Sequence, residues 1–183
     1  VEKSDVRSLL WYHSAAESGH PKAQYNLGIF YFEGRGNPVN FAEARRWFER
    51  AGVADQPGGF FNLAKMEEEG LGGAPNLPAA KACYAQAVLG GHDPAIPELR
   101  RILTAESPSG TEGPVGQADI SFVQSYLGAR GFEVGVPDGL FGERTRDAVV
   151  AYQRENGLEA SGSIDRDLVD RMLRQVADAA PQS

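Results

Sequence analysis

The stretch AAESGHPKAQYNLGIFYFEGRG, residues 15–36, opens a pattern that recurs along the first part of the chain. At steps of 36 residues, Ala15 is followed by Ala51 and Ala87. The other positions that recur at this step are Trp11, Trp47 and Cys83; Tyr12, Phe48 and Tyr84; His20, Gln56 and His92; Ala23, Gly59 and Ala95; and Leu27, Leu63 and Leu99. The motif Gly34-x-Gly36 returns as Gly70-x-Gly72. Self-similarity at a fixed period predicts a solenoid of stacked units.

Each unit has the pattern of two antiparallel helices. In the second unit, the first helix carries Ala44, Trp47, Phe48 and Ala51, and the second carries Phe60, Phe61, Leu63 and Ala64. Alanines let helices approach closely, and the rings fill the gaps between them. The glycine pair after each second helix ends that helix and redirects the chain. Asn40 and Asn76 are then placed to cap the next helix, and Pro78 suits a first helical turn.

Residues 15–36 carry Ala-Ala-Glu-Ser-Gly-His-Pro-x-Ala-Gln-x-x-Leu-Gly-x-x-Tyr-x-x-Gly-x-Gly, which resembles the Sel1-like repeat, a relative of the tetratricopeptide repeat. The resemblance covers about Asp5 to Leu103, and we place the solenoid at residues 1–104. The third copy departs from the pattern at Arg100 and Pro97, as terminal repeats that cap a stack commonly do. The resemblance implies a scaffold that binds an unidentified protein partner, on a concave face lined by the first helices.

A second informative stretch is DGLFGERT, residues 138–145. Upstream, Phe122, Val123, Tyr126 and Leu127 predict a helix that Gly131 caps. Asp138-Gly139 is typical of a tight turn. Downstream, one helix is expected through Ala148, Val149 and Tyr152 to Gly157, and another from about Asp165.

This order of elements resembles the three-helix peptidoglycan-binding domain. It consists of a helix followed by Asp-Gly-x-Phe-Gly, Thr-x-x-Ala-Val-x-x-Tyr-Gln, Gly-Leu and Gly-x-Ile-Asp. The resemblance runs from about Asp119 to Leu173, and we place the domain at residues 118–176. It departs after Asp165, where the family often has Thr and this chain has Arg166-Asp167-Leu168. The predicted fold class is therefore all-α: a helical-hairpin solenoid of about three repeats plus a small three-helix peptidoglycan-binding-like domain.

The resemblance directs the search for ligand contacts to the turn and the helix after it. The candidate peptidoglycan-binding residues are Asp138, Phe141, Arg144, Thr145, Tyr152 and Gln153. Arg144 suits a stem-peptide carboxylate, because its guanidinium forms bidentate charge-assisted hydrogen bonds. Tyr152 offers a ring face to a sugar or a methyl group. The alternative is a packing role for Phe141, Tyr152 and Leu158, and a loop-fixing or solvated role for Arg144 and Gln153.

The composition of the chain predicts the segments between and after the domains, and its charge limits the classes of molecule that it can bind. Residues 105–117 are rich in Gly, Pro, Ser and Thr and predict a linker, and residues 177–183 predict a fraying tail. The net charge of −7 and the lack of a basic patch exclude nucleic acid and disfavour an anionic membrane surface. An acidic wall-binding domain must rely on hydrogen bonds and shape, so we expect weak affinity at each site.

Signs of catalytic chemistry are sparse. His20 and His92 occupy equivalent positions two repeats apart, too far to share a metal, and no nucleophile has a base beside it in the sequence. We expect no catalytic residue, no metal and no cofactor, and hence no enzyme. The single cysteine, Cys83, cannot form an intramolecular disulfide, and its repeat position predicts a buried thiol.

We therefore expect a non-enzymatic scaffold of the bacterial cell envelope, located in the periplasm. The order of modules resembles the periplasmic region of alphaproteobacterial polar organelle development proteins (PodJ type), which implies a polarity or localisation factor. The chain opens at Val1 without a signal peptide or membrane span, so we expect a fragment with an export signal or membrane anchor upstream. One alternative is the targeting region of a wall hydrolase whose catalytic domain lies outside this chain. Another is a wall domain that has lost its ligand and serves only for packing or dimerisation.

Overall fold

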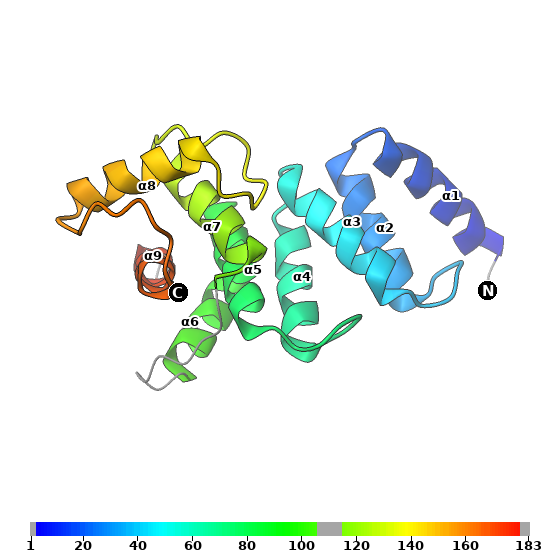
Figure 1. The fold of residues 1–183 in the computed structure, drawn as a ribbon. Helices are drawn as coiled ribbons and strands as arrows, with labels where there is room; N and C mark the ends of the chain where they lie inside the picture. The colour runs from blue at the N-terminus through cyan, green and yellow to red at the C-terminus, as the bar shows by residue number, and fades with distance from the viewer. Residues whose placement is uncertain (1–2, 106–114, 180–183) are drawn as a thin grey trace.

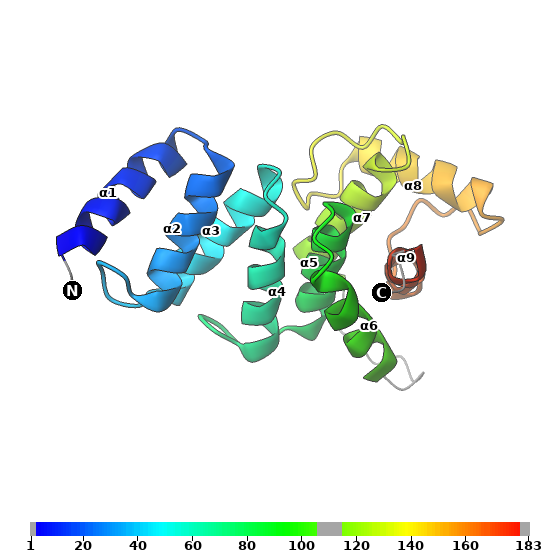
Figure 2. The same ribbon diagram turned by 180° about the vertical axis from the view of Figure 1, so that it is seen from behind.

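The computed structural model describes residues 3–105 and 115–179, and within these ranges all regular structure is helical. The elements are α1 (Lys3–Glu17), α2 (Pro21–Glu33), α3 (Phe41–Val53), α4 (Gly58–Glu69), α5 (Leu77–Leu89), α6 (Ala95–Ala105), α7 (Gln117–Gly128), α8 (Glu143–Glu155) and α9 (Arg166–Ala179). Successive helices from α1 to α6 pack side by side, and α1 lies at one end of the molecule with α8 and α9 at the other (Figures 1 and 2). The predicted all-α fold class, with three helical hairpins followed by a three-helix domain, is confirmed.

The helix ends follow the predicted signals. The Asn40 side chain accepts a hydrogen bond from the Glu43 amide at 3.1 Å, and Asn76 accepts one from Ala79 at 3.2 Å. Gly34 and Gly70 end α2 and α4 with φ values of 72° and 70°, a left-handed conformation that favours glycine. Both kinds of cap recur at the repeat period, so the first two hairpins end and are followed by the next helix in the same way.

Neighbouring hairpins touch through positions that have little or no side chain. A Cβ at Gly28 would lie 2.6 Å from Cδ1 of Phe48, so only glycine lets that ring lie against α2. Trp47 is 1% exposed and packs on Ala16, Ala23 and Leu27 of the first repeat. The repeat period therefore corresponds to a repeated packing arrangement.

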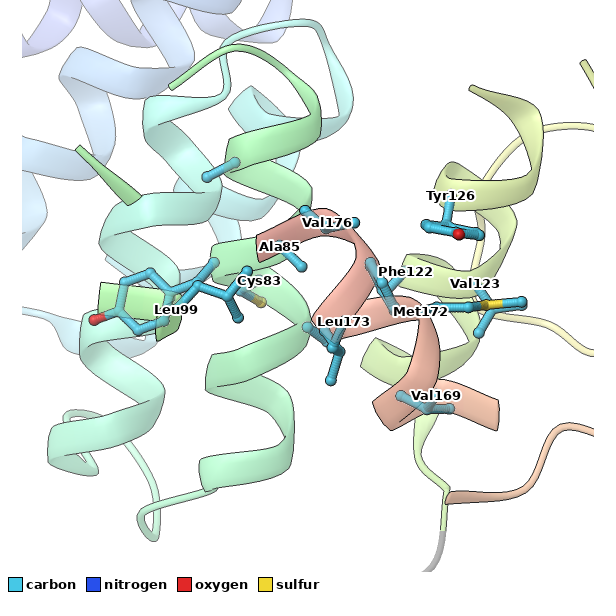
Figure 3. Close-up of a cluster of buried hydrophobic side chains, with 14 of the residues drawn as sticks. Cys83, Ala85, Leu99, Phe122, Val123, Tyr126, Val169, Met172, Leu173 and Val176 are labelled. Atoms are coloured by element: carbon cyan, nitrogen blue, oxygen red, sulfur yellow. The ribbon is translucent and has the colours of Figure 1, made fainter. Parts of the chain in front are cut away.

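The C-terminal domain packs directly on the third repeat. Helix α7 lies against α5, and α9 contacts both α5 and α6 (Figure 1). Cys83, Ala85 and Leu99 from the repeat join Phe122, Leu173 and Val176 from the domain in one buried cluster (Figure 3). The Gln86 amide also donates to Ser121 Oγ across this contact at 2.9 Å. The two domains share a hydrophobic core.

This contact explains why the third repeat departs from the pattern. Arg100 donates from Nε and Nη2 to the carbonyl oxygen of Ala177, at 3.2 and 2.9 Å, and so binds the last turn of α9. Pro97 lies in the first turn of α6, where its missing N–H leaves no helical bond unmade. The third repeat is an interface with α7 and α9, which corrects the prediction that it caps the stack.

Two predicted boundaries shift. Helix α9 continues through the buried Ala177 to Ala179. The predicted start of the tail, at residue 177, therefore lies three residues before the end of this helix is passed. Asp165 starts that helix by accepting the Leu168 amide at 2.8 Å, so the departure from the family pattern leaves the third helix intact. Most of the linker predicted at 105–117 lies outside the described residues, and its ends belong to α6 and α7.

Candidate functional site

The loop between α7 and α8, residues 129–142, is organised by the side chain of Gln124. This buried amide donates to Asp138 Oδ1, the Leu140 carbonyl and Thr145 Oγ1, each at 3.1 Å. Its oxygen accepts the Gly139 amide at 2.9 Å. Gly139 has a φ of 72°, and a Cβ there would meet Gln117 Cγ at 2.4 Å, so the tight turn requires glycine. One side chain from α7 thus holds the loop onto the start of α8.

Asp138 lies at the turn with its carboxylate exposed. Its Oδ1 accepts the Leu140 amide at 2.9 Å as well as the Gln124 amide. These two hydrogen bonds, the Leu140 one first, hold the pKa of Asp138 below its ordinary value. The carboxylate therefore stays charged and fixed in direction.

An exposed surface surrounds this turn, and we call it the loop face. It consists of Val136, Asp138, Leu140, Phe141, Arg144 and Arg146. Val136 is 72% exposed, Leu140 is 65% exposed and Phe141 is 39% exposed, while the Arg146 guanidinium lies 5.6 Å from the Phe141 ring centre. Apolar groups, the cations Arg144 and Arg146 and the carboxylates of Asp138 and Glu143 are thus exposed along this loop and the first turn of α8, which suits a ligand with both methyl and charged groups.

The structure separates the six predicted site residues into two groups. Asp138, Phe141 and Arg144 are exposed and belong to the loop face. Thr145 is buried beneath it, where it accepts the hydrogen bond from Gln124.

Tyr152 and Gln153 lie in the interior of the domain. The Tyr152 ring is 2% exposed and packs edge-on against Tyr126, while its hydroxyl donates to Gln175 at 3.1 Å. This hydroxyl end borders a separate hollow of about 700 Å³, together with Arg130 and Gln175. Contact of Tyr152 and Gln153 with a ligand stays a prediction, and neither residue belongs to the loop face.

Gln153 supports a second loop in the way that Gln124 supports the first. Its amide donates to Ser161 Oγ at 3.1 Å, and its oxygen accepts the Gly162 amide at 2.9 Å. Gly162, like Gly139, has a positive φ. Sequence reasoning missed Gln124, although a glutamine between the predicted core residues Val123 and Tyr126 was the available signal.

A groove runs along the inner side of the repeats and ends at this loop. Its volume is about 1120 Å³. The first helix of each hairpin contributes to it, and Phe60, Leu63 and Glu67 of α4 also line it. The C-terminal domain supplies the start of α7 and residues Val136, Pro137 and Asp138. The repeat groove and the loop face are therefore adjacent.

The described residues give no indication of redox or metal chemistry at this surface. Within residues 3–105 and 115–179, no group of three His, Cys, Asp or Glu side chains is placed to bind a metal ion. Cys83 is buried, and burial, followed by nearby Glu67 and Glu49, raises the pKa of its thiol. None of the helices described in those ranges has the length and apolar character needed to cross a bilayer.

Comparison with known families agrees with this division of the chain. Residues 116–172 match the peptidoglycan binding domain family. Residues 1–20, 21–52 and 61–92 match the Sel1 repeat family. Both are binding or repeat families rather than catalytic ones.

Among curated proteins, the chain is similar to the chitin synthase regulator SKT5 of Saccharomyces cerevisiae, with 42% identity over 50 residues, and to that of Malassezia restricta, with 43% over 51. It is also 43% identical over 49 residues to the N-acetylmuramoyl-L-alanine amidase CwlM of Mycobacterium tuberculosis. These matches cover 27–28% of this chain and 4%, 7% and 12% of the Malassezia, Saccharomyces and Mycobacterium proteins. Each similarity therefore covers a short segment of this chain and a small part of the relative.

Two solved structures share the fold. A Sel1 repeat protein from Oxalobacter formigenes matches with a TM-score of 0.55 and 23% identity, over 100% of this chain and 68% of that protein. The protective antigen c5321 of uropathogenic Escherichia coli matches with a TM-score of 0.53 and 22% identity, over 94% and 33% of the two chains. Families, structural neighbours and geometry together show that the chain consists of Sel1 repeats followed by a C-terminal domain of the peptidoglycan binding family.

Proposed function

We propose that this chain is a non-enzymatic scaffold of the bacterial cell envelope. Its C-terminal domain binds peptidoglycan, and its repeats bind a protein partner. The observation that carries the proposal is the exposed loop face with Asp138, Phe141 and Arg144, inside a region that matches the peptidoglycan binding family. Location in the periplasm and a role in polarity or localisation are the finer parts of this proposal.

The chemistry of the loop face suits a weak, specific contact with the wall. Arg144 is exposed and can approach a carboxylate with two of its guanidinium nitrogens. Phe141 and Leu140 offer apolar area to sugar rings or alanyl methyl groups. Because the whole chain carries a net charge of −7, attraction over a distance contributes little, and the contact rests on direct hydrogen bonds.

Co-sedimentation of the whole chain with purified peptidoglycan sacculi tests the proposal. We expect retention of the parent and a roughly tenfold weaker retention of Arg144→Ala, the loss that one charge-assisted hydrogen bond produces. Arg154→Ala, which changes another exposed arginine of α8, is the matched control and should bind as the parent does. The whole chain is required, because α7 and α9 bury part of their surface against the third repeat.

A second candidate function is the targeting region of a wall hydrolase, which the similarity to the amidase CwlM favours. In that case the natural polypeptide carries a zinc-ligand constellation beside this region, whereas a scaffold carries a coiled coil and a transmembrane helix. Full-length protein that releases soluble fragments from sacculi would establish the hydrolase. Retention without release, together with a fluorescent fusion that collects at one cell pole, would support the scaffold.

A further inference from the structure

The groove of about 1120 Å³ has walls from two different domains. On one side lie Arg46, Arg50 and Val53 of α3, and on the other lie Val136, Pro137 and Asp138 of the C-terminal domain. In both ribbon views, the loop between α7 and α8 reaches toward the end where α3 meets α4 (Figures 1 and 2). The shared core of α5, α6, α7 and α9 holds these walls in one arrangement.

The repeat wall offers an available cation. Arg50 lies 4.9 Å from the centre of the Trp47 ring, and among the described residues no carboxylate oxygen lies within 4.0 Å of its guanidinium. The neighbouring arginines differ from it, because Arg46 binds Glu43 at 3.3 Å and Arg45 binds Glu67. Stacking on an indole orients Arg50 without neutralising its charge.

The domain wall offers an anion in a fixed direction. The hydrogen bonds that Asp138 accepts from Gln124 and Leu140 both go to Oδ1, which leaves Oδ2 toward solvent. Apolar groups accompany the two charges, since Val53 is 58% exposed and Val136 is 72% exposed. Glu17 and Glu49 of the repeats also line the groove, together with Arg50. Charges of both signs and the exposed methyl groups of Val53 and Val136 suit an occupant that carries a carboxylate, an ammonium group and small apolar groups.

We infer that this groove binds the stem peptide of peptidoglycan, with contacts from both domains. Stem peptides are short, carry free carboxylates and methyl side chains, and present an ammonium group where their diamino acid is not cross-linked. In the groove, Arg50 binds a stem carboxylate, Asp138 accepts from the ammonium group, and Val53 and Val136 contact alanyl methyl groups. The inference rests on the proposed wall binding and adds that a repeat residue, Arg50, determines which wall component is bound.

Sacculus co-sedimentation with charge-reversed variants of the whole chain tests this inference. We expect Arg50→Glu to weaken retention roughly tenfold or more, because it replaces attraction of a carboxylate by repulsion. Arg7→Glu is the matched control, since it makes the same change of net charge at an exposed position outside the groove. Val53→Ser tests the apolar contact without a change of charge and should also weaken retention. Circular dichroism verifies that each variant is folded.

The outcomes separate this inference from the proposed function. If the parent chain is not retained, both fail. If Arg144→Ala weakens retention while Arg50→Glu and Arg7→Glu bind like the parent, the wall domain acts alone and the shared groove is rejected. Equal losses in Arg50→Glu and Arg7→Glu also reject it, because net charge would then explain both.

A soluble stem tetrapeptide that contains diaminopimelate supplies an independent readout. The chain has two tryptophans: the Trp47 ring lies under Arg50, whereas Trp11 belongs to α1, the helix at the far end of the solenoid (Figure 1). In a titration followed by ¹⁵N–¹H NMR, we expect the indole signal of Trp47 to shift and that of Trp11 to stay in place. An unmoved Trp47 signal, or equal shifts of both signals, would overturn the assignment.

Discussion

Trp11 and Trp47 occupy the same position in successive repeats and have opposite surroundings. Trp47 is 1% exposed, because α1 and α2 cover it, whereas Trp11 is 76% exposed on the open face of α1. We expect Trp47→Ala to lower the free energy of unfolding by about 3–5 kcal/mol. Trp11→Ala should change it by about 0.5 kcal/mol or less. Urea unfolding followed by far-ultraviolet circular dichroism measures both, and similar losses would show that Trp11 is covered in solution.

His92 couples the stability of the third repeat to pH. Its ring packs against Phe61 with centres 4.9 Å apart, and burial lowers the pKa of His92 below 6.5, with Asp93 opposing. The folded state therefore disfavours the imidazolium form. As pH falls through 6.5, the unfolded state takes up the proton more readily and the free energy of unfolding declines.

The measurement for His92 is the urea midpoint at about pH 7.5 and about pH 5. We expect His92→Gln to lose less stability between these two pH values than the parent. Glutamine is the residue at the equivalent position of the second repeat, Gln56. His20→Gln, at the equivalent and exposed position of the first repeat, is the matched control. A parent and a His92→Gln variant with the same pH dependence would contradict the prediction.

At the level of single site residues, the motif predicted where the loop lies better than what each side chain does. Asp138 and Arg144 are exposed, but Gln153 holds the Gly162 turn and Thr145 binds Gln124. A short polar motif cannot separate these roles, because loop-fixing and ligand-binding residues have the same side-chain chemistry. The sequence did not indicate that Gln124 holds the loop, because its hydrogen-bond partners lie 14 to 21 residues further along the chain.

At the level of the helices, the close contact between α3 and α4 limits which residues can replace Gly59. A Cβ at Gly59 would lie 2.3 Å from the carbonyl oxygen of Phe48. Alanine stands at the equivalent positions of the other repeats, Ala23 and Ala95, so the repeat pattern alone suggests that Gly59→Ala is harmless. The structure predicts the opposite, because backbone atoms of α3 occupy the space.

We expect Gly59→Ala to lower the free energy of unfolding by about 1–3 kcal/mol, although alanine favours helix over glycine by about 1 kcal/mol. Gly58→Ala is the control in the same helix, since its nearest neighbour is a Tyr25 ring carbon at 3.3 Å that can move. Thermal unfolding of the two variants compares them directly. If Gly59→Ala is as stable as Gly58→Ala, the two helices are packed less closely than described.

The helices themselves follow from the sequence because their signals are local. The repeat period, the Asn40 and Asn76 caps and the glycine turns each lie within a few residues of the boundary that they set. Contacts between the domains join residues far apart, such as Arg100 and Ala177, so no local pattern indicates them. One signal was available in α5, which is apolar almost throughout. Residues 79–87 are all buried, as expected for a helix covered on every side.

For the whole molecule, the shared core leads us to expect that the third repeat and the C-terminal domain unfold together. Buried residues of α3 to α9 belong to one cluster, and Figure 3 shows the part of it that joins the third repeat to α7 and α9. A disturbance of the interface should therefore spread into both domains, while α1 and α2, at the opposite end, keep their own contacts (Figure 1).

Arg100→Ala tests this coupling, because it removes two donors to the Ala177 carbonyl in the last turn of α9. We expect a loss of about 1–3 kcal/mol in the free energy of unfolding. Hydrogen exchange should speed up in α5, α6, α7 and α9 by a similar factor, and stay unchanged in α1 and α2.

The control is Arg101→Ala, whose ion pairs with Glu68 and Glu98 are at the surface and contribute about 1 kcal/mol or less. Faster exchange confined to α9 would mean that the domain detaches without opening the repeat, and the groove between them would then lack a fixed second wall.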